Sequence, residues 1–181
     1  MAQPTESRVF DELLLVRARQ GDGRAAERLA IRWYPRLRRA ARRILRDADL
    51  AEDAVQETWA GICSGWLGLS DPRRFPAWAY GILTRKCADS LRRIVRERER
   101  QSGQPVPAES GGGAPDARMG LNAAFASLPG DQRIAATLFF GEGLTLTEIS
   151  AATSVPLGTV KSRLFHARQK LKAALSGSEL P

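Results

Sequence analysis

Residues 144–172, LTLTEISAATSVPLGTVKSRLFHARQKLK, decide the fold of the last third of this 181-residue chain. Thr145 followed by Glu148 is a capping-box pattern, which predicts that a helix starts there. A turn is expected at Thr153 and Ser154. Pro156 then suits the first position of a second helix, because that position needs no backbone N–H donor. The stretch therefore predicts a short helix, a tight turn and a longer basic helix.

The longer helix has two different faces. Its apolar stripe follows three- and four-residue steps and comprises Val160, Leu164, Ala167, Leu171 and Ala174. A helix-turn-helix places such a polar face in the DNA major groove, with basic flanks on the phosphates. A solvated basic helix on an all-α domain is the alternative. The face opposite the stripe carries Thr159, Ser162, Phe165, His166 and Gln169, flanked by Lys161, Arg163, Arg168 and Lys170, and no acid interrupts it.

The composition favours a polyanionic partner. Lysine and arginine outnumber the acids, 28 against 20, which gives a formal net charge of +8, and 43% hydrophobic residues are enough for a core. Because the positive charge clusters, nucleic acid is a better candidate than a membrane surface. The chain has neither a long apolar run nor a signal-peptide pattern, so we expect no membrane span and a cytoplasmic location.

The residues that could carry chemistry are sparse. The two cysteines, Cys63 and Cys87, are far apart, and His166 is the one histidine. We expect buried thiols in a reducing compartment rather than a disulfide or a metal site. The sequence thus predicts no metal, no cofactor and no enzymatic activity.

The rest of the chain reads as helices, without strand-like alternation. Residues 101–116, QSGQPVPAESGGGAPD, are mostly small, polar, glycine or proline, which predicts a flexible linker. The expected fold class is all-α, with two small helical domains at 1–100 and 117–181 and a helix-turn-helix in the second. The predicted helices span 10–19, 24–45, 47–66, 75–98, 119–127 and 131–140.

Two of these helices carry charged faces. Along 47–66, the stripe Val55, Trp59, Ile62 and Trp66 should face the core. The opposite side bears Asp49, Asp53, Gln56 and Glu57, which suits either a solvated surface or docking to a basic protein. Along 75–98, Arg85, Asp89, Arg92 and Arg96 share a face, which suits either solvation or a second contact with nucleic acid.

The order of several motifs resembles a known family across nearly the whole chain. The motifs are AEDAVQE at 51–57, FPAW at 75–78, DSLRR at 89–93, Leu128-Pro129, LTLTEI at 144–149 and PLGTVKSR at 156–163. Together they resemble the extracytoplasmic-function (ECF) sigma factors of bacterial RNA polymerase, the smallest class of the sigma-70 family. The resemblance implies a subunit that binds core polymerase and directs promoter-specific initiation. It also implies an anti-sigma protein as a further partner.

The resemblance also implies roles for individual residues. The first domain would hold the polymerase clamp helices and read and melt the −10 element; the second would bind the −35 element and contact the flap of the polymerase beta subunit. On the −35 helix, Arg163 could bridge guanine O6 and N7 and Phe165 could meet a thymine methyl. The implied polymerase-binding residues are Asp49, Asp53, Gln56 and Glu57; the −10 residues are Arg85, Lys86, Asp89, Arg92 and Arg93; the −35 residues are Thr159, Lys161, Ser162, Arg163, Phe165, His166 and Arg168.

Two other functions compete with this one. A stand-alone helix-turn-helix regulator would bind DNA unaided, but the acidic face of the first domain would then have no purpose. A decoy that mimics a sigma factor to occupy its anti-sigma protein would not need an uninterrupted basic recognition helix.

Overall fold

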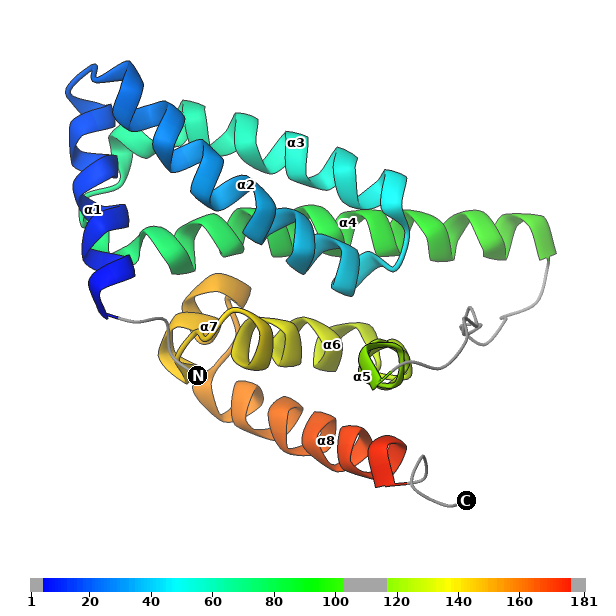
Figure 1. Ribbon diagram of the computed structural model, residues 1–181. Helices are drawn as coiled ribbons and strands as arrows, with labels where there is room; N and C mark the ends of the chain where they lie inside the picture. The colour runs from blue at the N-terminus through cyan, green and yellow to red at the C-terminus, as the bar shows by residue number, and fades with distance from the viewer. Residues whose placement is uncertain (1–4, 103–116, 177–181) are drawn as a thin grey trace.

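The computed structural model describes residues 5–102 and 117–176, and these ranges consist of helices and turns with no strand (Figure 1). The all-α class and the helix-turn-helix are therefore confirmed. Short helical turns at Trp66–Gly68 and Pro72–Arg74 lie between α3 and α4, and a wider turn, Thr137–Gly141, follows α6. The first group of helices is α1 (Thr5–Arg19), α2 (Gly23–Leu45), α3 (Ala48–Gly65) and α4 (Phe75–Ser102); the second group is α5 (Ala117–Ala126), α6 (Gly130–Ala136), α7 (Leu146–Thr153) and α8 (Leu157–Ser176).

Several predicted boundaries are wrong. Helix α1 begins at Thr5 rather than at residue 10, and α4 continues through Ser102 rather than ending at 98. Charged pairs one turn apart, such as Glu97 and Arg100 at 3.4 Å, support the exposed end of α4. The predicted linker 101–116 thus loses its first two residues to α4, and the rest of it, 103–116, lies outside the described residues.

Capping side chains set the start of α2 and of α3. The carboxylate of Asp22 accepts hydrogen bonds from the backbone N–H groups of Arg24 and Ala25 at 3.0 and 3.1 Å. The Asp47 side chain does the same at the start of α3. These bonds satisfy N–H groups that have no partner inside a helix. The break predicted between the helices 10–19 and 24–45 is present at residues 20–22, where Gly21 has a positive φ of 92°.

Aromatic side chains fill the core of the first group. Trp33 of α2 is 1% exposed and meets the Phe75 ring edge-on, with centroids 4.8 Å apart. The Tyr80 ring of α4 also packs against this indole, with the ring centroids 5.6 Å apart. Cys87 is buried as expected, whereas Cys63 is exposed, so the expectation of two buried thiols is wrong for Cys63. Its position near the end of α3 leaves it on the solvent side.

The second group builds the helix-turn-helix on α5 and α6. Helix α6 ends at Ala136, and the chain then widens into the turn, where the Glu142 N–H bonds to the Thr137 carbonyl. The predicted helix over 131–140 is therefore present, but its last part, Thr137–Gly141, is a π-helix and not a regular α-helix. The predicted stripe of α8 is buried from Val160 to Leu171, but Ala174 is exposed because the helix has passed its support there.

The two groups pack against each other and share one hydrophobic core. Ile149 and Ala152 of α7 and Leu138 of the wide turn belong to the same buried cluster as the side chains of α2 and α4. In Figure 1, α6 and α7 lie between the first group and α8. Helices α4 and α7 approach so closely that a Cβ added at Gly81 would lie 3.2 Å from the Ala152 carbonyl oxygen. The polar face of α8 consequently points away from the first group.

The contribution of the Asp22 cap to the stability of the protein can be tested by mutation. We expect Asp22→Ala to lower the free energy of unfolding by about 1 kcal/mol, because two N–H groups lose their acceptor. Asp22→Asn is the matched control, since asparagine caps as well as aspartate. Urea unfolding can be followed by fluorescence, because all four tryptophans precede residue 79. Equal stabilities of the alanine and asparagine variants would contradict the capping role.

Candidate functional site

The recognition helix α8 presents its polar face to solvent. Val160, Leu164 and Ala167 point inward, and the last of these packs in a small cluster with Ala136 of α6 and Phe125 of α5. This packing leaves the opposite face free, and Phe165 is 59% exposed. Among the predicted −35 residues, Lys161, Ser162, Phe165, His166 and Arg168 are exposed, while Thr159 and Arg163 are half-buried.

Arg163 differs from its neighbours on α8. Its Nε lies 3.1 Å from a carboxylate oxygen of Asp131, at the start of α6, and its side chain is 26% exposed. The guanidinium is thus held at the edge of the recognition face by an ion pair within the second group. A contact of Arg163 with a base would have to compete with this pair.

The turn before α8 is closed by side-chain hydrogen bonds. The Thr145 hydroxyl accepts from the Glu148 N–H at 3.2 Å, and the Glu148 carboxylate accepts from the Thr145 N–H at 2.7 Å, so the predicted capping box is confirmed. Ser154 adopts a left-handed φ of 55° between the two helices. The Ser150 hydroxyl donates to the Val155 carbonyl at 2.6 Å. The capping box fixes the start of α7, whereas Ser154 and the Ser150–Val155 bond set the direction of α8 relative to α7.

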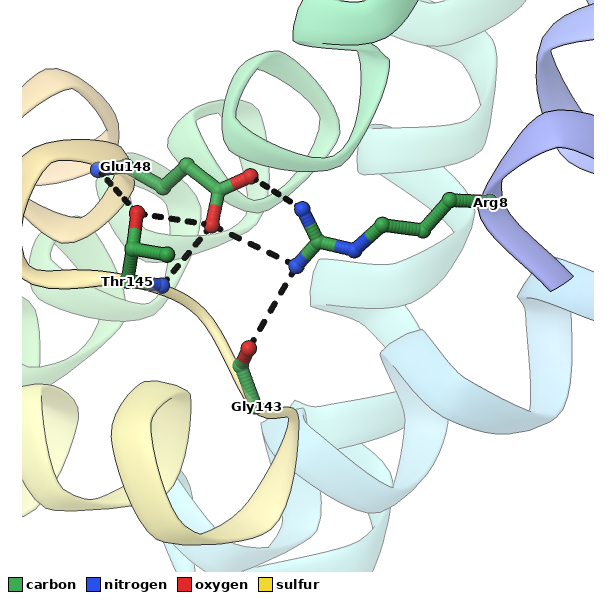
Figure 2. Close-up of polar contacts among 4 residues, drawn as sticks. All are labelled: Arg8, Gly143, Thr145 and Glu148. Carbon is green, nitrogen blue, oxygen red and sulfur yellow. Dashed lines mark hydrogen bonds and ion pairs between the residues drawn. The ribbon is translucent and has the colours of Figure 1, made fainter. Parts of the chain in front are cut away.

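Glu148 also has a partner outside its own group. Arg8 of α1 donates to both of its carboxylate oxygens, at 2.6 and 3.3 Å, and to the Gly143 carbonyl at 3.3 Å (Figure 2). Burial alone would raise the pKa of Glu148, but the hydrogen bonds from Arg8 and Thr145 outweigh it and hold this pKa below its usual value. The carboxylate therefore stays ionised at neutral pH.

The acidic face of α3 is exposed as predicted from its pattern. Asp49, Asp53, Gln56 and Glu57 are all exposed. Glu57 is ion-paired with Lys86 of α4 at 2.7 Å. A further acid, Glu52, pairs with Arg38 at 2.9 Å and accepts a hydrogen bond from Tyr34, which lowers the pKa of this carboxyl. Glu52 and Glu57 are therefore partly neutralised by their ion pairs, and Asp49 and Asp53 supply the remaining negative charge of this face.

The predicted −10 residues lie along α4. Arg85, Asp89, Arg92 and Arg93 are exposed. Arg92 pairs with Asp89 one turn earlier, while Lys86 is half-buried and engaged with Glu57. The exposed arginines give this side of α4 a net positive charge.

The contacts between the groups are the polar features that the sequence patterns missed. The Tyr80 hydroxyl donates to the buried Glu142 carboxylate at 2.5 Å, and burial next to this carboxylate raises the pKa of Tyr80 well above its usual value. The buried Arg133 donates to the Ile44 carbonyl at 2.9 Å, and burial lowers its pKa. The partners are separated by 62 and 89 positions. No local periodicity signals pairs so far apart.

Other kinds of site find little support in the described part of the chain. Residues 5–102 and 117–176 contain no group of three or more His, Cys, Asp or Glu placed to hold a metal ion. Burial raises the pKa of the Cys87 thiol to about 12, so it carries almost no thiolate. Within the same ranges no helix is both long and apolar enough to cross a bilayer.

Comparisons with known proteins match both groups. Residues 29–97 match the family model for Sigma-70 region 2, and residues 118–171 match that for Sigma-70 region 4. The chain is 34% identical to the ECF RNA polymerase sigma factor SigE of Mycolicibacterium smegmatis, over 96% of this chain and 69% of that protein. It is 28% identical to the ECF RNA polymerase sigma-E factor of Escherichia coli K12, over 89% and 92%.

Solved structures show the same architecture. CnrH in complex with the cytosolic domain of CnrY has a TM-score of 0.67 and 26% identity, covering 93% of this chain and 98% of that one. The sigma factor RpoE in complex with the anti-sigma factor NepR, from Bartonella quintana, has a TM-score of 0.68 and 24% identity, covering 83% and 96%.

The pKa of Glu148 leads to a pH dependence. Because this pKa is lower in the folded protein than the usual glutamate value of 4.5, the carboxylate contributes stability above that value. The contribution should be lost progressively as the pH falls below 4.5 and through the lower pKa of the folded protein. In urea unfolding across this range, Glu148→Gln should lose less stability than the parent. If the free energies of unfolding of the parent and of Glu148→Gln fell equally with pH, this role of Glu148 would be contradicted.

Proposed function

Because the chain belongs to the ECF family of RNA polymerase sigma factors, which act in transcription initiation and are not enzymes, we propose how its surfaces divide that work. The first group binds core polymerase and the −10 element, and the second binds the −35 element. With the end of α4 at Ser102, the corresponding domains are residues 1–102 and 117–181, joined by 103–116. We propose that the protein works in the bacterial cytoplasm, where the polymerase lies.

The exposed, acid-free face of α8 carries this proposal. Lys161 and Arg168 supply positive charge for phosphates, while Phe165 and His166 stand between them on the exposed face. The major groove admits an α-helix, and its base edges can be told apart by side chains of these kinds. The remaining −35 residues of the proposal are Thr159, Ser162 and Arg163.

The first group has the charges that its two proposed partners need. The acids of α3 are complementary to a basic helix of the polymerase clamp and would repel DNA from this face. The arginines of α4 suit the backbone of a strand that is being separated from its complement. The proposal assigns Asp49, Asp53, Gln56 and Glu57 to the polymerase, and Arg85, Lys86, Asp89, Arg92 and Arg93 to the −10 element.

The proposal includes an anti-sigma protein and the flap of the polymerase beta subunit as further partners. CnrH and the RpoE of Bartonella quintana were both solved with a bound partner, and the partner NepR is an anti-sigma factor. By analogy, an anti-sigma protein would bind this chain and keep it from the polymerase. The flap contact would fall to the second group.

Reconstituted transcription with core polymerase tests the docking surface. We expect Asp53→Lys to weaken core binding at least about tenfold and to reduce promoter-dependent transcripts accordingly, because it places a cation against a basic partner. Glu27→Lys is the matched control, since it makes the same charge change at an exposed position of α2.

Equal activity of Asp53→Lys and the parent would contradict docking through α3. Sequence-specific DNA binding without core polymerase, combined with no initiation in its presence, would instead indicate a stand-alone regulator.

The reading of bases by α8 is tested separately, on the holoenzyme. We expect Arg163→Ala to cost about 1–3 kcal/mol of promoter affinity and to relax the preference at one base pair. Lys170→Ala, at an exposed position, should weaken all sequences alike and lower the salt dependence of binding. An unchanged promoter preference in Arg163→Ala would rule out base reading by this residue and leave it a role on the backbone.

A further inference from the structure

The side chain of Arg8 joins two parts of the molecule that are far apart in the chain. Helix α1 begins outside both ranges matched by the family models, 29–97 and 118–171. Arg8 nevertheless reaches the capping box of α7, where its two terminal nitrogens hold the two oxygens of Glu148 (Figure 2). A guanidinium fork on a carboxylate is a strong and directional contact. Arg8 thus connects the first group to the start of the helix-turn-helix.

Several other polar contacts between the groups are more deeply buried. Glu142 has no exposed side-chain surface, and its partners Tyr80 and Arg39 come from the first group. The Thr84 hydroxyl donates to the Ala152 carbonyl at 3.3 Å in the α4–α7 contact. Removing one of these partners would leave a buried polar group unsatisfied. Such contacts hold the groups together but are poorly suited to being released.

The Arg8–Glu148 pair is more accessible to water than these buried contacts. The two side chains are 25% and 20% exposed, so water can reach both. When the pair separates, Glu148 keeps its bonds to Thr145, and Arg8 can be solvated. The pair can therefore open without leaving an unpaired charge in the core. Among the described contacts between the groups, it is the ion pair that can be released at the least cost.

The packed arrangement limits which promoter elements the free protein can bind at one time. The positions after which the −35 and −10 elements are named differ by about 25 base pairs, which at roughly 3.4 Å per base pair is on the order of 85 Å along B-DNA. A compact chain of this length has a radius of gyration of roughly 16 Å. Since α6 and α7 lie between α4 and α8, the two DNA-facing helices cannot span that separation while the groups are packed (Figure 1).

We propose that the Arg8–Glu148 ion pair is a strap that keeps the free protein closed and prevents simultaneous binding of both promoter elements. This regulation rests on the proposed function, but the strap itself is a property of the free chain. The shared apolar core also favours the closed form, so loss of the strap shifts a population and does not unfold the protein. The recognition face of α8 is exposed in either form.

The effect of the Arg8–Glu148 pair can be tested by measuring the distance between the two groups in the free protein. Donor and acceptor dyes are attached to Cys63 on α3 and to a cysteine introduced by Ala173→Cys on α8, both at exposed positions. Single-molecule energy transfer is then recorded on the full chain, without polymerase or DNA. Arg8→Ala and Arg8→Gln should each raise the open fraction roughly two- to five-fold, the range expected for a partly exposed ion pair.

Arg28→Ala is the matched control, because it removes an exposed arginine of α2 and should leave the distances unchanged. Circular dichroism verifies that each variant is folded. Identical distance distributions in the parent and in both Arg8 variants would overturn the strap, as would a parent that is mostly open. Since neither polymerase nor promoter is present, this result is independent of whether the transcription assays support the proposed function.

Discussion

The carboxylate of Glu142 has no exposed side-chain surface, and its partners come from the other half of the molecule. A buried carboxylate must be hydrogen-bonded or paired, because the cost of removing it from water is otherwise large. The Tyr80 hydroxyl hydrogen-bonds to one carboxylate oxygen, while the other oxygen has no hydrogen bond and only the ion pair with Arg39 at 3.5 Å. Both partners are in place only when α4 and α2 pack against the wide turn after α6. The orientation of the two groups is therefore constrained by this buried acid as well as by the apolar core that the groups share.

The wide turn after α6 places Glu142 where it can contact Tyr80. If α6 continued regularly through residue 140, as its sequence suggests, the chain would not bring Glu142 under Tyr80 in the same way. The bonds from Glu142 N–H to the Thr137 carbonyl and from Leu144 N–H to the Leu138 carbonyl close the wider turn and start the approach to α7. The same turn leaves Phe139 and Phe140 exposed. A local departure from regular helix geometry is thus offset by a long-range polar contact.

Ion pairs decide which charges the surfaces can offer to a partner. Glu57 is occupied by Lys86, and Arg163 is occupied by Asp131. A charge pattern read from the sequence counts these residues as free, although each is partly neutralised in the fold. Asp53 on α3 and Lys161 on α8 are exposed charges of opposite sign on different groups. This separation of charge is consistent with a protein that binds a basic protein surface and DNA at once.

Sequence alone was sufficient for the features that depend on neighbouring positions. The helix-turn-helix, the Thr145–Glu148 capping box and the buried stripe from Val160 to Leu171 follow from hydrogen bonds and spacings within one or two helical turns. Helix ends were less predictable: α4 runs on to Ser102, and Ala174 is exposed, because the extent of each helix depends on what it packs against. Only the tertiary structure determined the packing of the two groups, the pairing of Arg8 with Glu148 and the burial of Glu142. These contacts join positions 62 to 140 residues apart, and such pairs depend on the shape and charge of surfaces that form only after the helices have packed.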